Sequence, residues 1–286
     1  MNLKAYYAAL KPERTYANVM TTLAGFLFAC KWHISWALLF YTLVGTTLVV
    51  MSACAANNCT DRGIDARMPR TKKRATATGE LPVRNVAILA FVLGAIGLVV
   101  LVKYVNLLTC LLGVVAYVDY LVLYAWSKRT TPHSTLIGTI SGAVPLVAGY
   151  TAVTGIFDLT AALLGLVMIF WQMPHFYAIA IFRRADYAAA DLPVWSVRYG
   201  VRSTQYWLLA YTVLYVLAVL ALSIFGSGGP LLAIVMGLLG LYWLYLGFRG
   251  FAHANPTKWA RSMFGFSLIT LLALSVILPI SPLLST

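Results

Sequence analysis

Long runs of apolar residues constrain the fold of this chain more than any other feature. Of its 286 residues, 61% are apolar and only 10% are charged, and the mean hydropathy is +0.84. A soluble domain would be about half apolar and a quarter charged. A helix needs about 20 mostly apolar residues to cross a bilayer. The sequence therefore predicts an all-α integral membrane protein and excludes a soluble enzyme, a disulfide scaffold and a disordered chain.

Nine apolar stretches can be marked along the chain, which we take as one multi-pass domain over residues 1–286. We expect about nine transmembrane helices around a central cavity, and Pro174 predicts that the sixth bends or breaks. The stretches run roughly from 15–30, 35–57, 84–102, 105–126, 135–154, 159–182, 205–225, 229–248 and 262–283.

The charged residues predict how these helices are oriented. The formal net charge is +13, from 21 Lys and Arg against 8 Asp and Glu. With the N-terminus inside, all the basic residues except Lys31 and Lys103 fall on the cytoplasmic side. Cytoplasmic loops collect Lys and Arg, so the charge indicates topology rather than nucleic-acid binding. We expect an N-in, C-out protein of the cytoplasmic (inner) membrane whose cavity opens to the cytoplasm.

The first polar loop, at about 57–83, carries acids in a regular pattern. Asn57, Asp61 and Asp65 are spaced i, i+4 and i+8, which places them on one face of a helix. Two carboxylates and an amide oxygen suit Mg²⁺, and the basic residues Arg70 and Arg74 follow directly. An ordinary charged loop would explain the basic residues but not this helical register. The pattern favours a metal-bridged diphosphate at the membrane surface.

A second acidic cluster lies in the loop at about 183–203. Arg183 is followed by Asp186 and Asp191 at the end of an apolar stretch. Asp61 and Asp186 are four helices apart, and an even number of crossings returns the chain to the same side. The two loops could therefore bind a diphosphate from two sides, with Asn57, Asp61, Asp65, Asp186 and Asp191 as the metal ligands.

Several motifs resemble one known family. The NxxxDxxxD pattern from Asn57, with the Met68, Arg70, Thr71 and Arg74 that follow, is similar to the signature of the UbiA superfamily of intramembrane prenyltransferases. Its heme-farnesylating branch is matched by LKP at 10–12, LIGTISGAVP at 136–145, and WQMPHFYAIAIFR at 171–183 with Asp186 and Tyr187. In one departure, Tyr199 in PVWSVRYG stands where the branch commonly has a lysine.

The resemblance implies an activity with its cofactor and partners. The reaction would join farnesyl diphosphate, protoheme IX (heme b) and water, with Mg²⁺, to give heme O and diphosphate. A heme A synthase or a terminal oxidase would be a protein partner within the lipid bilayer. A sister prenyltransferase, acting on an aromatic acid or a quinone precursor, would share the diphosphate site. A transporter would need polar residues through both leaflets, whereas here they gather on one side.

The remaining candidate residues follow from the same argument. We expect Asn57, Asp61, Asp65 and Asp186 to be catalytic, and a second set to bind substrate: Arg70, Arg74, Tyr120, Tyr124, Lys128, Arg183, Tyr187 and His175. His175 could instead be a packed histidine at a helix break, and Lys128 a snorkelling anchor. Asp119 is either functional or a protonated acid that is hydrogen-bonded to a neighbouring helix.

Overall fold

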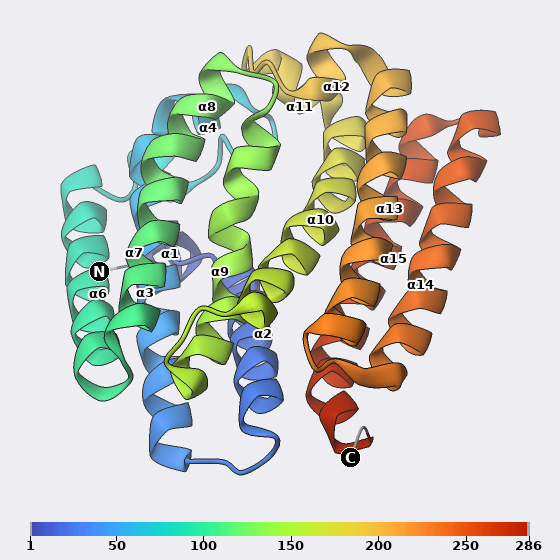
Figure 1. Cartoon of the computed structure of the whole chain (residues 1–286). Helices are drawn as coiled ribbons and strands as arrows, with labels where there is room; N and C mark the ends of the chain where they lie inside the picture. The colour runs from blue at the N-terminus through green and yellow to red at the C-terminus, as the bar shows by residue number, and fades with distance from the viewer. Residues whose placement is uncertain (1, 285–286) are drawn as a thin grey trace.

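The computed structural model describes residues 2–284, and over this range the chain forms helices and no strands. The long helices lie side by side in one bundle (Figure 1), and eight of them are long and apolar enough to cross a membrane. The eight are α3 (Trp36–Thr60), α6 (Val83–Tyr104), Leu107–Thr130, α9 (Ser134–Thr154), α10 (Leu159–Phe182), α13 (Gly200–Phe225), Gly229–Ala252 with α14 (Gly229–Arg249), and Pro256–Leu284 with α15 (Pro256–Ile280). The predicted all-α membrane fold is confirmed.

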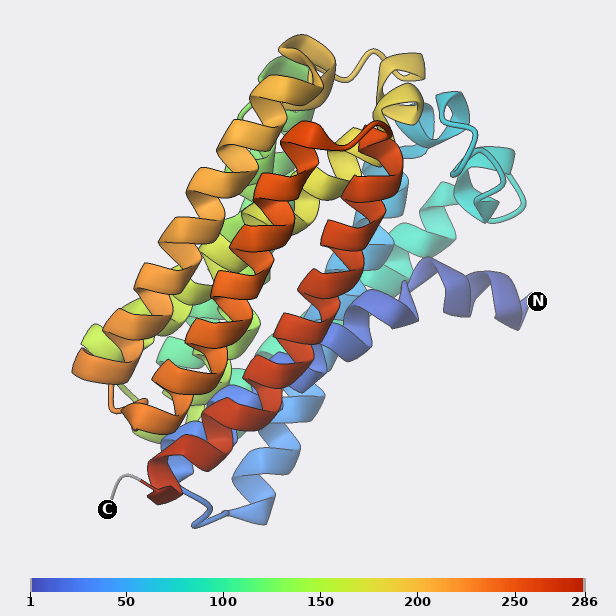
Figure 2. The same ribbon diagram turned by 90° about the vertical axis from the view of Figure 1, so that its right-hand side faces the viewer.

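The first predicted stretch differs from the other eight. It lies within α2 (Pro12–Cys30), whose first turn carries Glu13 and Arg14, and α2 is not among the eight helices that are apolar enough to cross. Even so, α2 packs against α9, α3 and α15 inside the bundle (Figure 2). The short α1 (Leu3–Ala9) projects sideways from the bundle, with Leu3 and Tyr7 exposed (Figure 2).

Two glycines allow α2 and α9 to touch backbone to backbone. A Cβ added at Gly25 would lie 2.1 Å from the carbonyl oxygen of Leu146, and one at Gly149 would lie 2.0 Å from that of Thr22. No larger side chain fits between the two helices. Close approach through small residues is a common way to pack helices in membranes, where apolar burial between helices gains little. This contact keeps the most polar long helix inside the bundle.

The two ends of the bundle differ in character. At one end lie α4 (Arg62–Arg67), α11 (Arg184–Ala189), α12 (Trp195–Arg198) and α8 (Tyr124–Thr130), shown at the top of Figure 1. The opposite end consists of short turns, at 31–35, 105–106, 155–158 and 226–228. Both acidic loops therefore lie at the same end of the molecule.

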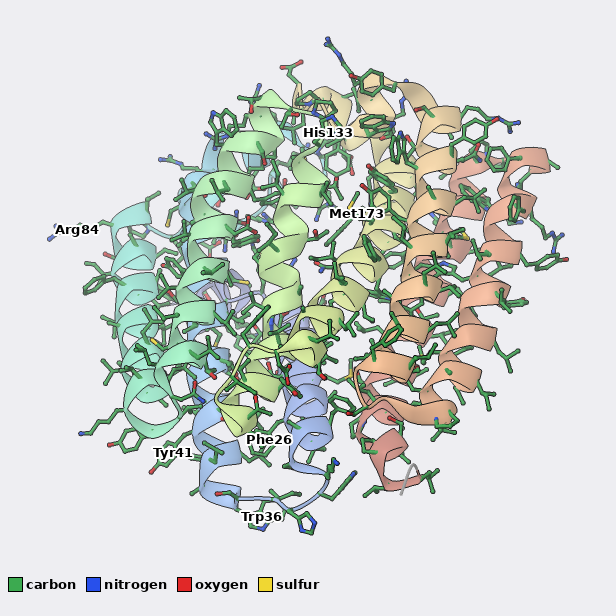
Figure 3. The ribbon with its side chains drawn as sticks, viewed as in Figure 1. Phe26, Trp36, Tyr41, Arg84, His133 and Met173 are labelled. Atoms are coloured by element: carbon green, nitrogen blue, oxygen red, sulfur yellow. The ribbon has the colours of Figure 1, made fainter. Side chains whose placement is uncertain are left out.

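Burial shows which helices are central. In the most apolar 18-residue stretch of α9 and of α10, 61% and 67% are buried. In the corresponding stretch of Leu107–Thr130, only 17% is buried. Met173 of α10 is fully buried at the centre of the bundle, and Arg84 points outward from α6 (Figure 3). α9 and α10 are thus the central helices of the bundle, and a site inside the bundle would be lined by their side chains.

Local helix geometry departs from the expected pattern at two places. The predicted bend or break at Pro174 is not a break, because α10 continues through it to Phe182. Instead, a π-helical turn at Asp119–Leu123 interrupts the run between α7 (Leu107–Val118) and α8. The buried Asp119 Oδ2 accepts a hydrogen bond from the backbone N–H of Ser141 in α9, at 3.0 Å. Asp119 is therefore hydrogen-bonded to a neighbouring helix.

Candidate active site

The acidic motif lies where α3 ends and α4 begins. Asn57 is in the last turn of α3, and Asp61 is the junction residue, so the two keep helical register. The Asn57 side-chain amide donates a hydrogen bond to Asp61 Oδ2 at 2.9 Å. Asp65 lies one turn further, within α4, and is 1% exposed. The spacing therefore does place these polar groups along one side of the chain.

Each carboxylate of the motif is paired with a cation. Lys128, at the end of α8, donates to Asp61 Oδ1. Arg74 contacts both oxygens of Asp65 through Nη1, at 2.8 and 2.7 Å. Arg129 contributes a further positive charge 3.9 Å from Asp61. The site thus consists of ion pairs between its own acidic and basic side chains. The basic side chains could turn from these carboxylates to an anionic ligand.

Two basic residues near the N-terminus also belong to this cluster. Lys11 Nζ donates to Asn57 Oδ1 at 2.6 Å, and Arg14 Nη1 donates to the Tyr120 hydroxyl at 3.1 Å. Burial, together with the Arg14 charge, lowers the pKa of Lys11 to about 7. The charge distribution predicts both cations only as part of the cytoplasmic side of the chain. The signal that could have placed Lys11 in the site is the LKP motif at 10–12, in which Lys11 directly precedes α2.

The second loop meets the first through an apolar contact. Ile64 and Met68 pack in one buried cluster with Ala190, Leu192 and Val194. This cluster holds α4 against the segment that follows α11, so acids that are far apart in sequence come to the same region. Tyr187 packs against it.

The charged residues of the second loop are not equivalent. Asp186 Oδ2 lies 3.6 Å from Arg183 Nη1 but, within the described chain, has no hydrogen-bond partner although it is buried. Asp191 is different, because its carboxylate is 85% exposed and pairs with Arg67 at 3.2 Å. Burial raises the pKa of Tyr187, while the positive charge of Arg70 opposes the shift. Asp186 and Tyr187 are therefore partly buried, whereas Asp191 is exposed to solvent.

An apolar cavity of about 360 Å³ lies directly below the charged cluster. Its walls come from α2, α3, α6, α7, α9, α10 and α15, and Arg14 and Tyr120 are among the polar residues that line it. Tyr120 donates to Asn57 Oδ1 at 3.2 Å and stacks on Tyr124 with the ring centroids 5.8 Å apart. Lys128 Nζ lies 5.3 Å from the Tyr124 ring centroid. Tyr120 thus connects the cavity to the acidic motif.

His175 lines the same cavity from α10. It is buried, its Nδ1 lies 2.7 Å from the Ser267 hydroxyl, and its ring stacks on Trp171 with the centroids 4.9 Å apart. His133 is not among the cavity residues, and its ring packs edge-on against Trp195. Of these two histidines, His175 is therefore the one placed to contact a ligand in the cavity.

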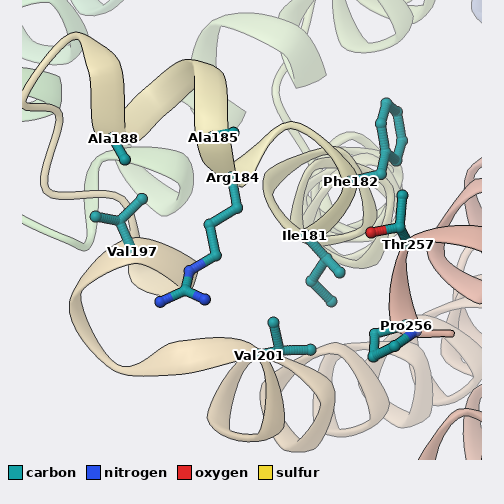
Figure 4. A pocket seen from close by; sticks show the side chains of 9 residues that line it. All are labelled: Ile181, Phe182, Arg184, Ala185, Ala188, Val197, Val201, Pro256 and Thr257. Atoms are coloured by element: carbon teal, nitrogen blue, oxygen red, sulfur yellow. The ribbon is translucent and has the colours of Figure 1, made fainter. Parts of the chain in front are cut away.

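A second hollow, of about 460 Å³, opens at the same end between α10, α11, α13 and α15. Arg184 is its one charged side chain, and the remaining lining is mostly apolar (Figure 4). None of the predicted site residues lines it. The central cavity, by contrast, is lined by the predicted residues Tyr120 and His175, and Tyr120 is hydrogen-bonded to Asn57 of the acidic motif, so we assign the site to the central cavity.

The donor set fits a hard cation. In residues 2–284, no three His, Cys, Asp or Glu side chains gather closely enough to form a metal cluster by themselves. The oxygens that could bind Mg²⁺ are the carboxylate oxygens of Asp61 and Asp65 and the amide oxygen of Asn57. The two carboxylates are at present bonded to the Asn57 amide, Lys128 and Arg74. The buried, unpartnered Asp186 Oδ2 is a further oxygen ligand of the right kind. A Mg²⁺ that keeps waters and shares a substrate phosphate suits such a partial set.

Comparisons with solved structures show the same architecture. A digeranylgeranylglyceryl phosphate synthase superposes with a TM-score of 0.81, at 16% identity, over 98% of each chain. A UbiA homologue from Archaeoglobus fulgidus bound to GPP and Mg²⁺ gives a TM-score of 0.73 at 14% identity, over 96% of this chain and 99% of that one. At these identities the likeness concerns the fold.

Sequence comparison adds relatives of much higher identity. Protoheme IX farnesyltransferase 1 of Shewanella sp. (strain W3-18-1) is 42% identical over 96% of this chain and 87% of its own length. Protoheme IX farnesyltransferase 2 of Pseudomonas fluorescens (strain Pf0-1) is 40% identical over 97% of this chain and 95% of its own. The model of the UbiA prenyltransferase family matches residues 18–270. The chain therefore belongs to the UbiA prenyltransferase family.

Proposed function

We propose that this protein transfers the farnesyl group of farnesyl diphosphate to a vinyl group of protoheme IX, and that addition of water gives heme O, with release of diphosphate. The observation that carries the proposal is the junction at Tyr120, where a charged cluster meets an apolar cavity. A prenyl diphosphate has two matching parts: an anionic diphosphate head group, which suits the charged cluster, and an apolar chain, which suits the cavity. The names of the relatives support the farnesyl donor and the heme acceptor.

The head group would bind among the charged residues. Mg²⁺ would be held by Asn57, Asp61, Asp65 and Asp186, and it would neutralise charge on the departing diphosphate. Asp191 stays a predicted fifth ligand, although its exposed carboxylate pairs with Arg67. The cations would turn from the carboxylates to phosphate oxygens, and they are Lys11, Arg14, Arg70, Arg74, Lys128 and Arg183.

The prenyl chain would lie in the cavity, away from bulk water. Ionisation of an allylic diphosphate leaves a cation, which the stacked ring faces of Tyr120 and Tyr124 could stabilise. The heme vinyl group would attack this cation from the His175 side of the cavity. The product would then pass to a heme A synthase or a terminal oxidase in the same membrane.

The orientation follows from the distribution of charge. The end that carries both acidic loops also carries the paired arginines and lysines of the site. The positive-inside rule assigns that end to the cytoplasm, in the inner membrane of the cell. Farnesyl diphosphate would then reach the site from the cytoplasmic face.

The test is direct assay of the reaction. Membranes that contain the protein are incubated with heme b, farnesyl diphosphate and Mg²⁺, and the extracted heme is analysed by mass. We expect heme O, its loss when Mg²⁺ is chelated, and its return when Mg²⁺ is restored. If the protein does not modify heme but prenylates an aromatic acid or a quinone precursor, heme is not the acceptor. The proposed diphosphate site would still stand.

A further inference from the structure

Gln172 presents a fixed hydrogen-bond acceptor to the cavity. Its side-chain nitrogen donates to the backbone carbonyls of Thr139, at 3.0 Å, and Met168, at 3.1 Å. Both amide hydrogens are therefore used, and the orientation of the amide is set by these two acceptors. Oε1 is left pointing toward Gly142, where an added Cβ would lie only 1.9 Å from it. Gln172 and Gly142 both line the cavity.

His175, one helical turn further along α10, presents a second acceptor. The Ser267 hydroxyl donates its single hydrogen to the Phe264 carbonyl at 2.6 Å, so it can only accept from His175 Nδ1. The neutral ring then carries its hydrogen on Nδ1 and a lone pair on Nε2. Among residues 2–284, no side chain or backbone group forms a hydrogen bond with Nε2.

Gln172 and His175 are neighbours on α10, because they are three residues apart, and both line the same cavity. A ligand that satisfies both must bring two hydrogens, and water is the component of the proposed reaction that does so. We propose that Gln172 Oε1 and His175 Nε2 bind and orient the water molecule that adds to the prenylated heme. This inference rests on the proposed function and assigns residues to its last step.

The chemistry balances with these groups. The carbon–oxygen bond of farnesyl diphosphate breaks, and the electron pair leaves with the diphosphate. The vinyl π electrons form the new carbon–carbon bond, which leaves a cation on the carbon next to the porphyrin ring. The lone pair of water forms a carbon–oxygen bond to that carbon, and the released proton passes to His175 Nε2. Without a held water, the cation loses a proton instead and yields an alkene that is one water lighter than heme O.

The ratio of these two products tests the inference. Gly142→Ala forces the Gln172 carbonyl away from its position, whereas Gly165→Ala, also on the central helices, meets only a Val147 methyl at 3.6 Å and serves as the matched control. Membranes with each variant receive heme b, farnesyl diphosphate and Mg²⁺ in ¹⁸O-labelled water. We expect the hydrated-to-dehydrated ratio to fall at least about tenfold in Gly142→Ala, the effect of one lost hydrogen bond, and to stay unchanged in Gly165→Ala.

A second variant tests the histidine side without crowding the cavity. Ser267→Ala removes the acceptor that holds the proton on Nδ1, while Ser275→Ala removes a hydroxyl that bonds only the Leu271 carbonyl. We expect a fall in the ratio for Ser267→Ala alone. The ratio is measured within one sample, so it does not depend on how much protein folds.

The outcomes separate the inference from the function on which it rests. An unchanged ratio in Ser267→Ala, or in any Gly142→Ala sample that forms product, would overturn the water site and leave the farnesyl transfer standing. If Gly142→Ala forms no product, Ser267→Ala decides. A wild-type protein that farnesylates no heme would overturn the proposed function itself.

Discussion

At the scale of single residues, the site is held together by oppositely charged side chains. Asp61 pairs with Lys128, and Asp65 with Arg74, so neither carboxylate is left unpaired in the interior. A buried charge without a partner would be costly, so these ion pairs offset the cost of burying the two carboxylates. Asp186 differs, because its Oδ2 lies 3.6 Å from Arg183 but has no hydrogen bond in the described part of the chain.

The first prediction compares three aspartates of the motif loops. Asp61→Ala and Asp65→Ala should each lower the rate of heme O formation at least about a hundredfold, because each removes a carboxylate ligand of the Mg²⁺ that would neutralise the departing diphosphate. Asp191→Ala removes the fifth predicted ligand, whose carboxylate is exposed and paired with Arg67, so it should lower the rate less than either of these changes. Rates are measured at saturating substrates, with membrane insertion checked by immunoblot. Full activity in Asp61→Ala would contradict the metal site.

The second prediction concerns the lysine that precedes α2. Lys11→Met should lower kcat/KM for farnesyl diphosphate by roughly ten- to a hundredfold, the worth of one charge-assisted hydrogen bond. Lys4→Met, which removes the same charge from an exposed position on α1, is the control and should leave kcat/KM unchanged. Equal effects from the two variants would show that only the overall charge matters.

The sequence predicted part of this site for a clear reason. Register within one helix is local, so the spacing of Asn57 and Asp61 was enough to bring them into contact. Lys11 and Arg14 enter the site through the packing of α2 on α9, which the spacing of charges does not encode. The exposure of Asp191 depends on how the chain turns after α11, where the φ of Asp191 is 55°. The spacing of residues along the sequence does not predict such a turn.

At the scale of helices, the apolar stretches predicted most of the long elements, since length and composition decide what can span a bilayer. The π-helical turn at Asp119–Leu123 was not predicted, because one extra residue in a turn leaves no mark in an apolar run. It comes between Tyr117, which bonds Ser52 at 3.1 Å, and Tyr124 near the charged cluster. Such turns inside α-helices are frequent at functional sites.

The third prediction tests the contact between α2 and α9. Gly149→Ala places a methyl 2.0 Å from the backbone of Thr22, which cannot move aside as a side chain could. We expect a loss of about 1–3 kcal/mol in stability, the usual cost of overpacking. Gly237→Ala on α14, where an added Cβ meets nothing within 4 Å, is the control. Thermal unfolding in detergent, followed by tryptophan fluorescence, compares the two; equal melting temperatures would contradict the close contact.

At the scale of the whole molecule, the charged residues of the candidate site gather at one end of the bundle, next to the central cavity. The acidic loops, their cations and the mouth of the cavity lie together, while the opposite end has short turns. The helices that line the core, α9 and α10, are the most buried, and Leu107–Thr130 is largely exposed to what would be lipid. The bundle thus separates a polar reaction end from an apolar body.

The fourth prediction concerns the orientation of this bundle. Single-cysteine variants, Arg67→Cys at the acidic end and Lys31→Cys at the other, are made after the four native cysteines are replaced by alanine. In spheroplasts, a membrane-impermeant thiol reagent should label Lys31→Cys at once and Arg67→Cys only after the membrane is disrupted. The reverse pattern would place the active site outside the cell.

The depth of the cavity carries a consequence of its own. From Arg14 and Tyr120 near its polar mouth, the lining continues down to Leu101 and Thr109, both almost fully buried. Under the proposed function, an isoprenoid anchored by its head group among the charged residues would extend toward these two side chains. The size of the residues at these two positions would then decide how many isoprene units the cavity accepts, far from the reacting carbon.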